Sequence, residues 1–81
     1  MNDMYKVRPV PTGFHIAEEI AERGWSVHDL RRKLHVDTLV FIGMMTGRVV
    51  IRGHLARELA RVFDTGPEFW VALDRQWREG R

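Results

Sequence analysis

Glycine and proline residues divide this chain into short segments, and that division constrains the fold more than any other feature. Gly24, Gly47 and the pair Gly66 and Pro67 flank runs in which apolar residues recur every three or four positions. Glycine just past such a run is a common helix end, and proline is favoured in the first turn of a helix. The sequence therefore predicts an all-α fold of five short helices joined by tight links.

The first three helices are predicted from periodicity and from residues that cap helix ends. They are a helix over residues 14–23, a helix of about two turns opened by Ser26, and a helix capped by Asp37 that runs to Thr46 and is closed by Gly47. Asp29 follows Ser26 by three residues and completes a variant of the capping box. The expected inner stripe of the second helix is Val27, Leu30 and Leu34.

The last two helices are predicted over residues 53–63 and from residue 67 onward. The fourth has a poorly capped start and an inward stripe of Leu55, Leu59, Val62 and Phe63. For the fifth, Thr65 is the expected cap, Pro67 lies in the first turn, and Glu68 is the expected capping-box partner. One face of the fifth helix is predicted to carry Phe69, Trp70, Leu73 and Trp77.

Composition limits the class of protein. The 81 residues include no cysteine, which excludes disulfides and thiolate metal sites. No apolar run reaches the roughly 20 residues that span a bilayer, and the N-terminus lacks the pattern of a signal peptide. We therefore expect a soluble cytoplasmic protein without membrane contact. Pro9 and Pro11 separate an N-terminal arm or short edge strand, residues 1–10, from one helical domain, residues 11–81.

Basic residues are concentrated in the middle of the chain. The formal net charge is only +2, but the pI of about 9.7 reflects many arginines. They are Arg31, Arg32, Lys33, Arg48, Arg52, Arg57 and Arg61. A basic stripe of this kind suits phosphate binding, and the alternative is a solvated helix face that keeps the protein in solution.

Catalytic and metal-binding patterns are absent from the sequence. Four histidines occur, but none forms an i, i+4 ligand pair, and no glycine-rich phosphate loop or serine nucleophile motif is present. His28 and His35 could approach each other across a turn, although a surface position explains them equally simply. We expect no enzyme activity, no metal and no cofactor.

Several segments, taken in order, resemble the Cro/repressor (lambda-repressor-like, XRE) superfamily of helix-turn-helix proteins, and within it the HigA-type antitoxins. The resemblance covers residues 11–76 without a gap. Its elements are Gly13 with Ile16, Glu18 and Glu19; ERGWS at 22–26; Leu30, Leu34 and Val36; Gly47 with Arg48; Ile51, Leu55, Ala56, Leu59 and Ala60; and TGPEFW at 65–70. The last of these is close to the family's signature before the final helix.

The resemblance implies a DNA-binding regulator that acts as a homodimer and has a toxin partner. The helix over residues 38–46 would enter the major groove of double-stranded DNA. Phosphate contacts would then fall to Arg31, Arg32, Lys33, Arg48 and Arg52. Thr38 and Thr46 are the neutral hydrogen-bonding groups near the groove.

The outward positions of that helix depart from the family pattern. Where polar or basic residues are usual, this chain has Leu39, Val40, Ile42 and Gly43. Arg31 replaces a small residue at the expected helix crossing, and His35 replaces the glycine of the turn. An apolar outward face predicts a protein interface of Leu39, Val40, Ile42 and Met45, with Trp70 and Trp77 as core residues or dimer anchors.

Three hypotheses follow from the sequence. The chain is a DNA-binding regulator, a helix-turn-helix scaffold that binds another protein through its third helix, or a structural homodimer that uses the same face. Burial of the apolar positions within the monomer, by rotation of the third helix or by the arm or fifth helix, is the remaining explanation of their character.

Overall fold

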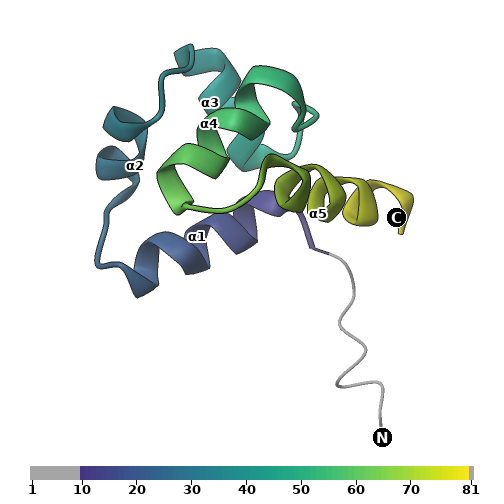
Figure 1. The fold of residues 1–81 in the computed structure, drawn as a ribbon, viewed down its shortest axis with the longest axis horizontal. Helices are drawn as coiled ribbons and strands as arrows, with labels where there is room; N and C mark the ends of the chain where they lie inside the picture. The colour runs from purple at the N-terminus through teal and green to yellow at the C-terminus, as the bar shows by residue number, and fades with distance from the viewer. Residues whose placement is uncertain (1–9, 81) are drawn as a thin grey trace, which may run out of the picture.

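The computed structural model describes residues 10–80, which form five α-helices and contain no strand (Figure 1). The helices are α1 Thr12–Glu22, α2 Val27–Lys33, α3 Thr38–Thr46, α4 Gly53–Phe63 and α5 Pro67–Glu79. The predicted all-α class is confirmed for these residues. The predicted arm, apart from Val10, lies outside the described residues. None of the five helices combines the length and apolar character that crossing a membrane requires.

Local capping signals determine most helix ends. The Ser26 hydroxyl accepts the Asp29 backbone N–H, while the Asp29 carboxylate accepts the Ser26 N–H, so the predicted capping box is present. Asp37 caps α3 by accepting the Leu39 N–H at 3.1 Å. Gly47 ends α3 in the left-handed region at φ 81°, which favours glycine. The predicted ends of α3 and α4 agree with the structure, whereas α1 begins two residues before the predicted start.

The predicted cap of α5 is wrong. Gly66 occupies the N-cap position and makes no side-chain capping bond. The Thr65 hydroxyl instead accepts the indole N–H of Trp70 at 2.8 Å. Burial of the Trp70 ring explains the difference, because a buried indole N–H needs an acceptor.

The core lies between α1, α4 and α5, with contributions from one side of α2 and α3. Its buried side chains are Ile16, Ile20, Leu30, Leu34, Phe41, Met44, Ile51, Leu55, Ala56, Leu59, Phe63 and Trp70. The chain folds back after Gly24, so that Trp25 stacks on Phe63 with ring centroids 5.9 Å apart. Phe63 in turn lies 5.4 Å from Trp70, which extends the aromatic contact to α5.

Two residues predicted to face inward are exposed. Val27 lies in the first turn of α2, and Leu30 and Leu34 alone from its predicted stripe are buried. Phe69 lies on the surface of α5 and meets Trp70 edge-on, with centroids 5.0 Å apart. Both errors have the same cause, because the apolar stripe of a short helix is wider than the part that its neighbours cover.

A buried carboxylate joins three separate parts of the chain. Asp74 of α5 accepts hydrogen bonds from the Thr12 hydroxyl at 2.9 Å and from the Ile51 backbone N–H at 3.1 Å. Arg78 donates to the same carboxylate at 2.8 Å and to the Val49 carbonyl at 2.9 Å. These bonds connect the first turn of α1, the loop between α3 and α4, and α5.

Helices α1 and α3 approach each other closely at Gly13. A Cβ atom at this position would lie 2.2 Å from the Met45 carbonyl oxygen, which is too close for any pair of unbonded atoms. Only glycine therefore permits this crossing, and the crossing determines how near α3 lies to α1.

Replacing Gly13 with alanine separates this packing effect from helix propensity. Alanine in a helix is favoured over glycine by about 1 kcal/mol, so propensity alone predicts a more stable protein. We expect Gly13→Ala to lower the free energy of unfolding by about 1–3 kcal/mol, because two helices must move apart. Urea denaturation followed by tryptophan fluorescence measures it. Ala17→Gly, at an exposed position of α1, is the control for propensity, and a stabilised Gly13→Ala protein would contradict the close crossing.

Candidate functional site

The turn between α2 and α3 is held by side chains of α4. Its residue His35 donates its backbone N–H to the Glu58 carboxylate at 2.8 Å. The His35 carbonyl accepts from Nε2 of His54 at 2.9 Å, so this nitrogen carries the proton. Arg61 donates to the Lys33 carbonyl at 2.6 Å. Backbone groups on both sides of the turn thus have fixed partners, and the turn sets the direction in which α3 leaves α2.

Glu58 owes its ionised form to these partners. Its buried carboxylate accepts from Arg61 at 2.7 Å and from the His35 N–H. These hydrogen bonds, that of Arg61 first, lower the pKa of Glu58 to about 2. The sequence expectation that the glycine replaced by His35 would disturb the turn is not needed here, since His35 has no positive φ.

The outward face of α3 is largely apolar. Leu39 is 75% exposed and Ile42 is 51% exposed. Thr38 and Thr46 are exposed on the same helix, but both hydroxyls already have partners in the protein. The Thr38 oxygen accepts from the Arg31 guanidinium, and the Thr46 hydroxyl donates to the Ile42 carbonyl at 2.8 Å. The surface that α3 presents is therefore made mainly of methyl and methylene groups.

The other predicted interface residues are at least half-buried. Val40 and Met45 pack against the core, and Trp77 lies with its ring against Gly47. Trp70 is 1% exposed, so its prediction as an interface residue is corrected to a core position. Since Trp70 fills the space beside Phe63, it offers no surface to a partner. Leu39 and Ile42 are thus the exposed members of the predicted set.

Arginines lie near both ends of α3. Arg31 projects from α2 to the first residue of α3, where it bonds Thr38 and lies 5.8 Å from the centre of the Phe41 ring. Arg48 follows the glycine that ends α3 and is exposed. Among residues 10–80, no hydrogen bond or ion pair of the Arg48 side chain is found. The apolar face is therefore bordered by positive charge along the helix axis.

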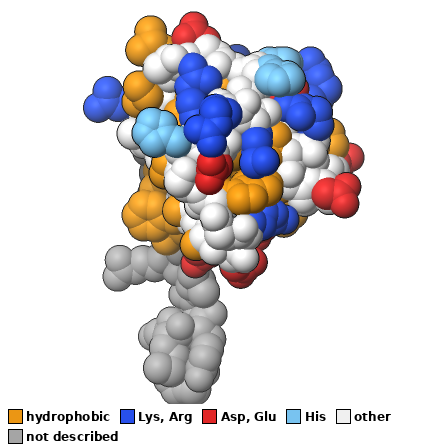
Figure 2. All heavy atoms as spheres, turned by 90° about the vertical axis from the view of Figure 1, so that its left-hand side faces the viewer, with side chains coloured by type: hydrophobic (Ala, Val, Ile, Leu, Met, Phe, Trp, Pro, Cys, Tyr) orange, Lys and Arg blue, Asp and Glu red, His pale blue; other side chains and the backbone are white. Residues whose placement is uncertain are grey.

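The remaining predicted phosphate-binding residues are placed elsewhere. Arg32 forms an ion pair with Asp29, and the Lys33 ammonium lies 4.5 Å from the centre of the Trp25 ring. Arg52 precedes α4. The predicted basic residues thus form separate groups. Figure 2 looks onto the side of the molecule where α2 lies, and Lys and Arg side chains gather over much of that face.

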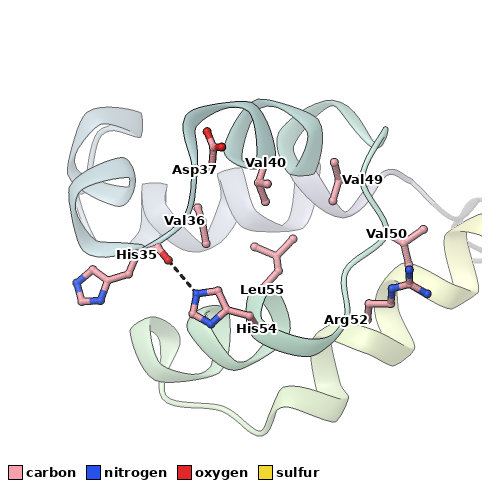
Figure 3. A pocket seen from close by; sticks show the side chains of 9 residues that line it. All are labelled: His35, Val36, Asp37, Val40, Val49, Val50, Arg52, His54 and Leu55. Atoms are coloured by element: carbon pink, nitrogen blue, oxygen red, sulfur yellow. Dashed lines mark hydrogen bonds between the residues drawn. The ribbon is translucent and has the colours of Figure 1, made fainter.

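A groove of about 550 Å³ separates the start of α4 from α3 (Figure 3). Val40, Val49 and Leu55 point into it, and Asp37 and Arg52 lie at opposite ends. His35 and His54 line it as well, joined by the hydrogen bond already described. Leu39 and Ile42 do not line the groove, so the groove and the outward face of α3 are different surfaces.

Metal chemistry finds no support in this part of the chain, where residues 10–80 contain no cluster of three histidine or carboxylate side chains arranged to hold an ion. Comparison of the chain with models of protein families, with curated proteins and with solved structures found no match. The candidate site must therefore be interpreted from its own geometry. That geometry consists of an exposed apolar helix face, bordered by arginines and positioned by a rigid turn.

The lowered pKa of Glu58 predicts a pH dependence of stability. A carboxylate whose pKa is lower in the folded than in the unfolded state stabilises the fold above the unfolded value, here about 4.5. That contribution should be lost as the pH falls toward about 2. We expect Glu58→Gln to be less stable by about 1–3 kcal/mol at neutral pH and to depend less on pH in this window. Urea titrations across the window measure both effects.

Glu22→Gln is the matched control, since Glu22 is exposed and its pKa is not shifted. It should retain the full pH dependence of the wild-type protein. Equal pH dependence in the wild type and in Glu58→Gln would show that Glu58 does not hold the turn in the ionised form.

Proposed function

We propose that this chain is a DNA-binding regulator of the helix-turn-helix type, in which α2 and α3 form the pair and α3 enters the major groove. The observation that carries the proposal is the placement of α3, whose outward face is exposed between Arg31 and Arg48. A helix in the major groove needs such a free face, with cations where it meets the phosphates on either side.

Rigidity of the turn supports the proposal. A recognition helix must hold its orientation to a fraction of an ångström if its side chains are to meet base edges. Here Glu58 and His54 bind both backbone polar groups of His35, and Gly13 sets the distance between α1 and α3. The helix is therefore held before DNA arrives, and binding costs little ordering entropy.

Charge supports it as well. Arg31 and Arg48 lie closest to α3, whereas Arg32, Lys33 and Arg52 extend the positive field beyond it. Residues at a distance from the groove still attract DNA through the long-range field, and this attraction weakens with salt. Arg32 contributes less, because Asp29 neutralises it locally.

The sequence resemblance to Cro/repressor proteins and HigA-type antitoxins supplies the finer parts of the proposal. It supports a homodimer on two half-sites about one helical turn apart, a toxin partner and a cytoplasmic location. Residues 22–26 and 65–70 are its most informative segments.

A second function is favoured by one observation, the exposure of Leu39 and Ile42 on neighbouring turns of α3. In this alternative the helix binds another protein or a second copy of the chain, and DNA binding is weak. Apolar contact then supplies the affinity, and the arginines at the ends of α3 serve as a polar rim.

The first prediction from this proposal concerns salt. We expect Arg48→Gln to weaken binding to all duplexes alike and to reduce the slope of log affinity against log salt by about one, because one phosphate contact is lost. Fluorescence polarisation with labelled duplexes at several salt concentrations measures the slope. Arg75→Gln, at an exposed arginine of α5, is the matched control and should leave the slope unchanged. A wild-type protein that binds no duplex at low salt would rule out the proposal.

The alternative predicts a different response. If α3 joins two copies of the chain, Leu39→Glu combined with Ile42→Glu should convert a dimer to a monomer, because like charges would meet across the interface. Sedimentation velocity of both proteins over a range of concentrations measures this. An unchanged sedimentation coefficient would exclude self-association through α3.

A further inference from the structure

We propose that α3 recognises thymine methyl groups through Leu39 and Ile42, so that the preferred DNA sites are defined by the placement of A·T pairs in the major groove. This inference rests on the proposed DNA binding and adds the chemistry by which one duplex is distinguished from another.

The first argument is the chemistry that α3 offers. Leu39 and Ile42 are its exposed large side chains, and neither carries a donor or an acceptor. Thr46 uses its hydroxyl on the Ile42 carbonyl, and the Thr38 oxygen is taken by Arg31. In the major groove most base-edge groups are donors or acceptors, and the thymine C5-methyl group is the apolar exception. Apolar side chains therefore find a favourable partner at thymine and leave polar edges unpaired elsewhere.

The second argument is spacing. Leu39 and Ile42 are three residues apart, which is about 4.5 Å along a helix axis at a rise of about 1.5 Å per residue. Successive base pairs lie about 3.4 Å apart. Two side chains at this separation can each meet a methyl group on neighbouring base pairs when α3 lies obliquely in the groove.

The third argument is charge. An apolar face alone would have no reason to approach DNA, but Arg31 and Arg48 border this face at its two ends. Contacts from these arginines to phosphates would hold the helix in the groove and exclude water from the methyl contacts. The same charges fit a polyanion better than they fit an uncharged protein surface.

Replacing thymidine with deoxyuridine provides the test, because it removes only the methyl group and keeps base pairing. The probe is the tightest-binding duplex selected by the protein from a random-sequence pool at low salt, prepared with either base. Affinity is measured by fluorescence polarisation. We expect wild-type protein to bind the deoxyuridine duplex about fourfold more weakly for each methyl group contacted, the factor expected for one buried methyl or methylene group.

Protein variants show whether Leu39 and Ile42 are responsible. Leu39→Ala with Ile42→Ala should bind the two duplexes equally, which also corrects for any change in DNA shape. Val50→Ala is the matched control, because Val50 is an exposed aliphatic residue outside α3, 46% exposed. It should retain the wild-type ratio. Circular dichroism confirms that the variants are folded.

The outcomes are separable. A ratio that is raised in the wild type and in Val50→Ala but abolished in the double variant supports methyl recognition. Equal binding of both duplexes by the wild type overturns this inference and leaves DNA binding intact. Failure to select any duplex at low salt overturns the proposed function and methyl recognition together.

Discussion

The buried carboxylate of Asp74 is the interaction on which the arrangement of the helices most depends. It receives hydrogen bonds from the first turn of α1, from the loop after α3 and from Arg78 of its own helix. A buried charge is stable only when such partners are all present, so each of these segments must take its place for the others to hold. The end of α3 is thereby fixed relative to α1 and α5.

A second carboxylate, Glu58, does for the start of α3 what Asp74 does for the loop that follows it. Glu58 belongs to α4 and binds the turn before the helix, whereas Asp74 belongs to α5 and binds the loop beyond it. Phe41 and Met44 secure the middle of α3 in the core. The helix is thus held at both ends by polar bonds and along one side by apolar contact, which leaves its opposite side free.

Local signals allowed much of this fold to be predicted, and non-local bonds did not. Ser26, Asp37 and Gly47 act on backbone groups within a few residues, so their effects follow from the sequence nearby. Asp74 meets Thr12 across 62 positions, and Glu58 meets His35 across 23, so no local pattern identifies either carboxylate as an anchor. The exposure of Leu39 and Ile42 agrees with the predicted outward face, whereas the burial of Trp70 depended on neighbours that the sequence does not reveal.

The free side of α3 has a consequence for how such a protein can change. Leu39 projects into solvent and lies outside the core, so exchanging it should alter folding stability by only about 0.5 kcal/mol. Ile42, on the next turn, also lies outside the core. Mutations at these two positions can therefore accumulate without loss of the fold, and a population of such chains could diversify its recognition while every member keeps the same scaffold.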